Sequence, residues 1–138
     1  MSFIYKPKSR KQLENNFRYR NRKGVNGFKD LKDFLDWYSE QELLCSYCGL
    51  TELEMQELSM SGLLSSKRFP KNGIVGQGTS RAVWLEVDRL NPNYLYSRDN
   101  CVLCCYFCNN DKSDVFHGYD YTNFFQNRVE YLRKLIKK

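Results

Sequence analysis

Two Cys-x-x-Cys turns constrain the fold of this chain more than any other feature. They are Cys45 with Cys48 in "CSYC" and Cys105 with Cys108 in "CYFC", far apart in the sequence. Each turn can present two thiolates to one ion, and two such turns complete a tetrahedral zinc site. We therefore predict that these four cysteines bind a structural Zn²⁺ that ties distant segments together. With four protein ligands the ion has no open position, so it holds the fold and performs no chemistry.

A second pair of cysteines, Cys101 and Cys104, has the same spacing and leaves an alternative pairing open. We favour Cys105 with Cys108, because a turn that enters a helix suits chelation better than the interior of a strand. Cys101 and Cys104 are then expected to be small apolar strand residues. Scattered core cysteines and a redox dithiol are the competing interpretations of the six thiols.

The zinc prediction also depends on a reducing compartment. The N-terminal stretch "MSFIYKPKSR" lacks the apolar segment of a signal peptide, and no apolar run approaches the length of a membrane span. We therefore expect a cytoplasmic protein with no membrane partner, where thiols stay reduced.

At 138 residues the chain is long enough for one α+β domain and hardly long enough for two. Apolar periodicity, caps and glycines indicate where its elements lie. We expect a helix from Leu31 behind an N-cap at Asp30, a short helix over 51–60, a loop over 61–81, strands over 81–90 and 100–105, a helix from about Cys108 and an amphipathic helix over 120–138.

The first quarter of the chain is strongly basic. Residues 1–32 hold ten Lys and Arg side chains against two acids, whereas the whole chain carries only +6. A local field of this strength suits a polyanion, most often nucleic acid. We expect residues 1–28 to form an irregular, basic, DNA-contacting arm. Its candidate contacts are Arg18, Arg20, Arg22 and Lys23. The alternative is a solvated arm with no fixed partner.

The strand–strand–helix order around the second thiol pair is carried by "VDRLNP", "NCVLCCYFCN" and "CNNDKS". These stretches resemble the HNH (ββα-metal) nuclease family, which has Asp-His-φ-x-Pro on its first strand, an Asn opening the second, and Cys-x-x-Cys-Asn-x-x-Lys on the helix. The resemblance covers residues 84–116 closely, with the first thiol pair as an outlying part. It implies a zinc-stabilised ββα-metal core over 45–116, flanked by helices.

The resemblance also implies roles for individual residues. Positions matching Asp88 and Asn109 hold a catalytic divalent ion, and the position matching Asn100 fixes the loop that bears the general base. Carboxylate and amide oxygens are hard ligands that suit Mg²⁺ or Mn²⁺, and phosphodiester hydrolysis needs such a cation to neutralise developing charge. Lys112 lies three residues after Asn109, hence on nearly the same helix face, where it can contact a phosphate. Glu86 shares a strand face with Asp88 and is a second-rank candidate.

The sequence departs from the family pattern at Arg89, which occupies the position of the general-base histidine. A guanidinium is always protonated and cannot accept the proton of a water molecule. It can instead clamp the scissile phosphate through two hydrogen bonds. The base is then another group. His117, which is the single histidine, one of Tyr47, Tyr94 and Tyr96, and metal-bound hydroxide are the candidates.

These observations lead to the hypothesis of a metal-dependent DNA endonuclease that hydrolyses phosphodiester bonds. A type II restriction-like HNH enzyme is its most specific form, and a phage or homing-type HNH nuclease is an alternative. Double-stranded DNA is the expected partner, and a homodimer follows if the target is palindromic. Two hypotheses from other classes compete: a zinc-stabilised nucleic-acid-binding module with a degenerate catalytic site, and a protein-interaction zinc domain.

Overall fold

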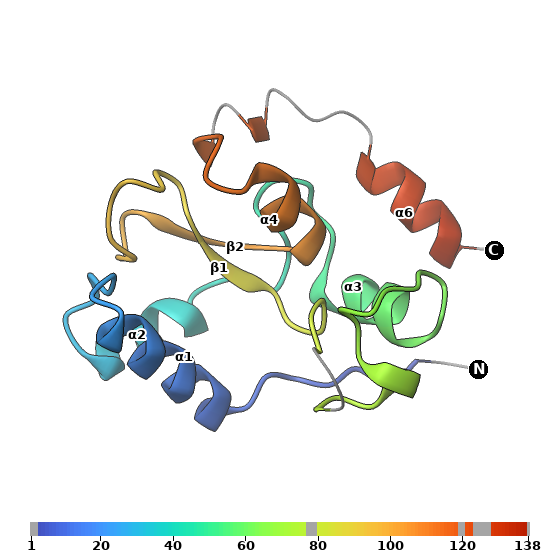
Figure 1. Cartoon of the computed structure of the whole chain (residues 1–138), viewed down its shortest axis with the longest axis horizontal. Helices are drawn as coiled ribbons and strands as arrows, with labels where there is room; N and C mark the ends of the chain where they lie inside the picture. The colour runs from blue at the N-terminus through green and yellow to red at the C-terminus, as the bar shows by residue number, and fades with distance from the viewer. Residues whose placement is uncertain (1–2, 77–79, 119–120, 123–127, 138) are drawn as a thin grey trace.

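A two-stranded antiparallel sheet lies between helices on both of its sides (Figure 1). The structure is a computed structural model that describes residues 3–76, 80–118, 121–122 and 128–137. Its elements in chain order are α1 (Arg10–Arg22), α2 (Leu31–Ser39), α3 (Glu52–Met60), the short 3₁₀ helix η1 (Lys71–Gly73), β1 (Glu86–Arg89), β2 (Cys101–Cys104), α4 (Tyr106–Lys112) and α6 (Arg128–Ile136). This α+β arrangement confirms the expected fold class. Among the helices of the described ranges, none is long and apolar enough to span a membrane.

The sheet fixes which side chains face which helix. Strands β1 and β2 pair with Glu86 opposite Cys104 and with Arg89 opposite Cys101. Side chains alternate along a strand, so Glu86 and Asp88 share one face of β1 and Arg89 lies on the other. Figure 1 shows α4 above the strands and α1 and α2 below them; Asn109 and Lys112 of α4 contact Glu86 and Asp88 of β1.

Strand β1 is shorter than the run of β-forming residues that predicts it. Its ladder begins at Glu86, because the main-chain N–H of Leu85 donates to the buried carboxylate of Glu52, 2.8 Å away, instead of to a strand. Ala82 also adopts a positive φ of 62°, which breaks the extended conformation. A side chain from another element therefore decides where the strand starts, and the local sequence carries no sign of it.

The N-terminal region differs from the irregular arm that was predicted. Ser9 and Gln12 form a capping box that starts α1 (Arg10–Arg22). Leu13 is buried, and the ring of Phe17 lies 6.0 Å from that of Phe34 in α2. The prediction of an irregular arm is wrong because two apolar positions one helical turn apart are enough to anchor a helix once a neighbouring aromatic cluster exists.

The segment that precedes α1 is also held in place. The main-chain N–H and C=O of Lys6 bond to the buried Gln56 of α3 at 2.9 and 2.8 Å. Trp84 donates its indole N–H to the same carbonyl, and Tyr5 donates to Glu52. The first described residues are thus held against α3 by hydrogen bonds.

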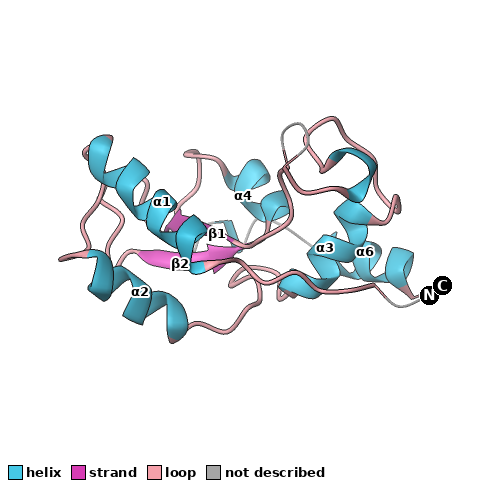
Figure 2. Cartoon of the chain, turned by 90° about the horizontal axis from the view of Figure 1, so that it is seen from below, coloured by secondary structure: helices cyan, strands magenta, loops and turns pink. Residues whose placement is uncertain are grey.

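The expected helices after Asp30 and Thr51 are both confirmed. Asp30 caps α2 by accepting from the N–H of Asp33, and Thr51 caps α3 within a capping box with Glu54. The predicted C-terminal helix is described over Arg128–Ile136, where α6 packs beside α3 (Figure 2). Residues 120, 123–127 and 138 of that prediction lie outside the described residues.

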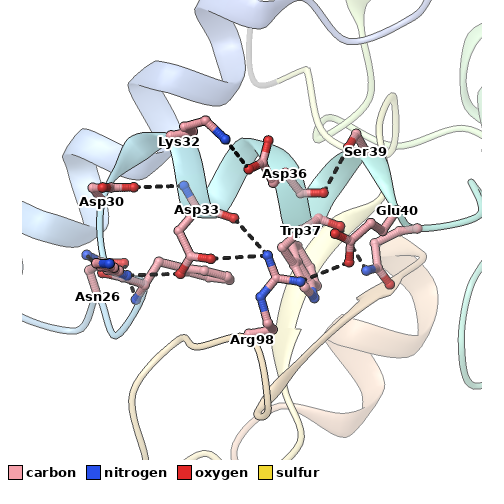
Figure 3. A network of polar contacts seen from close by, with 12 residues as sticks. Asn26, Asp30, Lys32, Asp33, Asp36, Trp37, Ser39, Glu40 and Arg98 are labelled. Atoms are coloured by element: carbon pink, nitrogen blue, oxygen red, sulfur yellow. Dashed lines mark hydrogen bonds and ion pairs between the residues drawn. The ribbon is translucent and has the colours of Figure 1, made fainter.

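One exposed arginine anchors α2 to the loop between the strands. The guanidinium of Arg98 donates to Glu40 at 2.8 Å and to the Asp33 carboxylate at 3.1 Å, as Figure 3 shows. These two acids lie near opposite ends of α2. The described part of the 61–81 segment is a loop as predicted, interrupted only by η1.

Candidate active site

Four thiols from the two Cys-x-x-Cys turns meet in one cluster. The sulfur atoms of Cys45, Cys48, Cys105 and Cys108 all lie within 4.8 Å of one another. The Sγ atoms of Cys48 and Cys105 are 3.8 Å apart, which matches the separation of about 3.8 Å that tetrahedral Zn–S bonds of about 2.3 Å require. The structure thus brings together the four cysteines of the preferred pairing, and the cluster can hold a metal ion such as zinc.

Hydrogen bonds shape each turn of this thiol cluster. In the first turn, the N–H of Gly49 donates to the carbonyl of Cys45 at 2.9 Å, and the N–H of Ser46 ties the turn to Leu103 of β2. In the second, Cys105 is the N-cap of α4, and its sulfur accepts from the N–H of Cys108 at 3.4 Å. Each turn is therefore held by an element that borders the candidate active site.

The remaining cysteines have a different environment. Burial raises the pKa of Cys101 to about 12 and that of Cys104 well above its ordinary value. Cys101 and Cys104 are thus neutral core residues of β2, as predicted.

Asp88 projects from β1 into a nearly closed environment, with 8% of its surface exposed. Its Oδ2 accepts a hydrogen bond of 2.6 Å from the hydroxyl of Tyr47. Burial and this hydrogen bond raise the pKa of Tyr47, so the tyrosine keeps its proton and acts as a donor. Tyr47 is thereby unsuited to be the general base, although the sequence left that role open.

Lys112 was expected at a surface position from which it could contact a phosphate, but its side chain lies inside the protein. Its side chain is fully buried, and Nζ lies 3.2 Å from Asp88 Oδ2 and 3.1 Å from the carbonyl of Arg89. It faces β1 because α4 lays its inner face along Glu86 and Asp88. In this arrangement Lys112 neutralises a buried carboxylate and has no exposed surface with which to reach a phosphate.

Asn109, one helical turn before Lys112, meets the other acid of β1. Its Nδ2 donates to Glu86 Oε1 at 2.5 Å, which leaves the amide oxygen as the free acceptor of this side chain. Arg81 also binds Glu86 through both carboxylate oxygens, at 3.0 and 2.9 Å. The structure therefore brings Asn109 to the face of β1 that carries Asp88, with Glu86 as the residue that it contacts directly.

Asn100 holds the loop that follows β1. Its side-chain oxygen accepts from the N–H of Asn91 at 2.9 Å, and its Nδ2 donates to the carbonyls of Asn91 and Leu95, each at 3.0 Å. Three hydrogen bonds from one side chain thus set the path of residues 91–95. This geometry agrees with the loop-fixing role that the family resemblance implies for the position.

Arg89 follows Asp88 at the end of β1, and its side chain lies against the loop after the strand. Its guanidinium carbon is 4.7 Å from the centroid of the Tyr96 ring, and Nη1 donates to the carbonyl of Tyr94 at 3.2 Å. The Arg20 guanidinium also stacks on Tyr96, at 4.8 Å. A tyrosine in contact with two guanidinium groups is a feature of the site that spacing in the sequence did not reveal.

His117 is exposed and lies near the end of β1, since the N–H of Gly118 donates to the carbonyl of Leu90 at 2.9 Å. Gly118 has no room for a side chain, because a Cβ there would lie 2.7 Å from Leu90 Cδ2 and 3.3 Å from the Tyr47 ring. The chain after α4 is thus packed directly against the residue that binds Asp88.

The candidate nucleic-acid contacts of the N-terminal region have two orientations. Arg18, Arg22 and Lys23 are exposed on α1 and at its end. Arg20 instead points inward, where it stacks on Phe34 at 5.7 Å and on Tyr96. Three of these four side chains are therefore available on the surface, and the fourth lines the interior of the site.

Taken together, a ββα unit with a carboxylate on its first strand, an asparagine on its helix and a thiol cluster at the start of that helix defines an HNH-like fold. Among solved structures, the chain is similar to the rare-cutting HNH restriction endonuclease PacI, at a TM-score of 0.64 and 23% sequence identity. The similarity covers 93% of this chain and 84% of PacI. The sequence matches no protein-family model and no curated protein.

Proposed function

We propose that this protein is a metal-dependent endonuclease that hydrolyses phosphodiester bonds of double-stranded DNA. The observation that carries the proposal is that α4 brings Asn109 to the side of β1 that carries Asp88, beside the four-thiol cluster, in a fold that PacI also has. PacI is described as a restriction endonuclease that perturbs DNA, and a type II restriction-like activity is the corresponding specific form for this chain. If the target is palindromic, the active form is a homodimer.

Asp88 and Asn109 are the proposed ligands of a catalytic Mg²⁺ or Mn²⁺ ion. The donor set fits such an ion, because a carboxylate and an amide oxygen are hard ligands and Mg²⁺ keeps several waters besides one or two protein oxygens. When bound, the ion supplies positive charge to the phosphate during hydrolysis. Tyr47 and Lys112 fix the orientation of the Asp88 carboxylate from behind. Zn²⁺ is the proposed occupant of the thiol cluster, with a structural role.

Arg89 is proposed to bind the scissile phosphate and to stabilise the negative charge of its transition state. A guanidinium can do this through paired hydrogen bonds. Stacking on Tyr96 orients Arg89 before the substrate arrives. His117, Tyr94, Tyr96 and metal-bound hydroxide are the candidates for the proton acceptor, since Tyr47 is held as a hydrogen-bond donor.

A second candidate function is a zinc-stabilised nucleic-acid-binding module without catalysis. It is favoured by the ion pair between Asp88 and Lys112, which neutralises the carboxylate without any divalent ion. Arg89 at the position of the general base also favours this alternative, because a guanidinium cannot accept a proton. This alternative predicts DNA binding that weakens with salt and is unaffected by Mg²⁺.

A plasmid-cleavage assay with Mg²⁺ or Mn²⁺ tests both functions. The wild type is compared with Asp88→Asn, which preserves size and removes charge, and with the exposed Asp99→Asn as a matched control. Cutting by the wild type and by Asp99→Asn, but not by a folded Asp88→Asn, supports the endonuclease. Salt-dependent binding with no cutting under any condition supports the binding module. Equal cutting by Asp88→Asn would remove Asp88 from the mechanism.

A further inference from the structure

A cavity of about 530 Å³ lies between α1 and the sheet and adjoins the candidate active site. Lys8, Arg20 and Arg81 line it together with Glu86 and Asn109. The last two are the side chains that contact each other beside Asp88. The cavity therefore opens next to the proposed catalytic residues, and α1 forms its other wall.

The charges in this cavity do not balance. Glu86 is the single acid among the residues that line it, and its carboxylate is already bound by Arg81 through two hydrogen bonds of about 3 Å. Lys8 and Arg20 are left without an acidic partner in the cavity. Two like charges brought together away from water cost free energy unless an anion compensates them.

One side-chain nitrogen of Arg20 lacks a hydrogen-bond acceptor among the described residues. Its guanidinium is held by stacking on Phe34 and Tyr96, so it cannot turn freely toward solvent. Its Nη1 is buried and has no hydrogen-bond partner among the described residues. A buried donor without an acceptor is rare in folded proteins and indicates a ligand or an ordered solvent molecule at that point.

The ammonium group of Lys8 also lies in an environment that disfavours its charge. Burial, and after it the charge of Arg20, lowers the pKa of Lys8 to about 8. Burial also lowers the pKa of Arg20. An oxyanion between the two cations removes this penalty, because it restores a favourable environment for both charges.

We infer that Lys8 and Arg20 form a binding site for a backbone phosphate of the DNA substrate, next to the phosphate that is cleaved. The identity of the ligand rests on the proposed function, whereas the oxyanion site rests on the cavity and its charges alone. A cavity of this volume is of the size that encloses a small organic ligand, and it exceeds the space that a lone phosphate fills. A phosphate within a nucleotide chain therefore fits it better than a free ion.

This assignment gives the N-terminal region a positioning role. The segment before α1 is fixed by Gln56 and Trp84, so Lys8 is presented from a rigid support. A phosphate held by Lys8 and Arg20 would set the register of the strand that passes Asp88 and Asn109. Lys8 and Arg20 are positioning residues in this scheme, because they contact the substrate away from the reacting atoms.

The test is DNA binding by the zinc-loaded, full-length protein without Mg²⁺, measured with a mixed-sequence duplex oligonucleotide at several salt concentrations. Lys8→Gln is compared with Lys134→Gln, which removes the same charge from the exposed face of α6. We expect Lys8→Gln to weaken binding about three- to tenfold and to reduce the salt slope by about one, as the loss of one phosphate contact should. Lys134→Gln should leave both close to the wild type.

A second variant and a second probe complete the test. Arg20→Lys keeps the charge but removes the unpartnered nitrogen, and its circular dichroism and zinc content verify that it folds; weakened DNA binding is expected. Inorganic phosphate is then titrated against thermal stability. Equal DNA binding by Lys8→Gln and Lys134→Gln would overturn the inference. The inference would also be overturned if inorganic phosphate raised the melting temperature in a Lys8-dependent way while DNA affinity did not depend on Lys8. That result would identify a site for free phosphate.

The plasmid assay separates this inference from the proposed function. Wild-type protein that binds DNA through Lys8 but cuts no plasmid would support the phosphate site and overturn the nuclease. If the wild-type protein cuts plasmid, but Lys8→Gln and Lys134→Gln have equal DNA affinity and salt slope, the nuclease is supported and the phosphate site is overturned.

Discussion

The ammonium nitrogen of Lys112 lies 3.2 Å from Oδ2 of Asp88, and both side chains are buried. The lysine belongs to the helix and the aspartate to the strand of the ββα unit, so the ion pair joins the two elements that form the candidate active site. It gives the buried carboxylate a counter-charge inside the protein, where an unpaired charge would be costly.

Replacing Lys112 by methionine should destabilise the protein strongly. The change leaves Asp88 as a buried carboxylate without its counter-charge, and the loss of one partner from a buried pair costs about 3–5 kcal/mol. Urea denaturation of the zinc-loaded protein measures the effect, with the exposed Lys137→Met as the control. The double variant Lys112→Met/Asp88→Asn should recover part of the loss. Unfolding free energies within 1 kcal/mol of each other for Lys112→Met and Lys137→Met would contradict the importance of the ion pair.

Metal content should separate the two types of cysteine. We expect about one zinc ion per chain in the wild type, and loss of zinc together with cooperative folding in Cys105→Ser. Cys101→Ala, which replaces a neutral buried thiol, should retain the metal. Elemental analysis and circular dichroism, repeated after addition of a chelator, provide the measurements. Zinc retained at the same stoichiometry by Cys105→Ser would show that the cluster is not the binding site.

Gly118→Ala should disturb the support of Asp88. The added methyl group would lie 2.7 Å from Leu90 Cδ2 and 3.3 Å from the Tyr47 ring, so the side chains must move. We expect a loss of about 1–3 kcal/mol, as for other overpacked sites, together with reduced activity because Tyr47 positions Asp88. Shortening Leu90 makes room for the added methyl group, so Gly118→Ala should cost less stability in a Leu90→Ala background than in the wild type. A double-mutant cycle measures this difference. Strict additivity of the two changes would argue against the contact.

Arg89→His tests the departure from the family pattern. The imidazole loses the paired donors and the stacking on Tyr96, so we expect cleavage to slow by at least about tenfold, by analogy with the removal of other groups that stabilise transition-state charge. Single-turnover cleavage rates measure this, with Arg89→Lys as the variant that keeps the charge. A faster rate for Arg89→His would instead show that this position faces the attacking water and accepts its proton.

Acidification should weaken the attachment of α2 through Arg98. The main-chain N–H of Lys29, and next the Arg98 guanidinium, hold the pKa of Asp33 below its ordinary value of 3.8. A lowered pKa in the folded state stabilises the protein above the ordinary value, and this contribution disappears as the pH falls through the folded value. Melting curves of wild type and Arg98→Gln should therefore differ at neutral pH, approach each other as the pH falls below the ordinary value of 3.8, and converge below the lowered pKa of Asp33. A difference in melting temperature that is constant down to pH 2 would exclude this origin.

The sequence predicted the parts of the structure that depend on local spacing. Two residues between cysteines allow their thiols to share one ion, and Asp30 marks a helix start because its side chain caps a nearby free N–H group. Alternation along β1 placed Glu86 beside Asp88. These relationships act over a few residues, so they can be read before the fold is known.

Only the tertiary structure decided which distant groups meet these residues. Tyr47 reaches Asp88 across 41 positions, Lys112 turns from an expected phosphate contact into a buried counter-charge, and Lys8 and Arg20 converge on one cavity. The physical reason is that burial and charge pairing depend on how α1, β1 and α4 pack, and that packing is set by the whole core. The local sequence determined which chemical groups the site contains, whereas packing determined which of them are paired and which remain free to bind an anion.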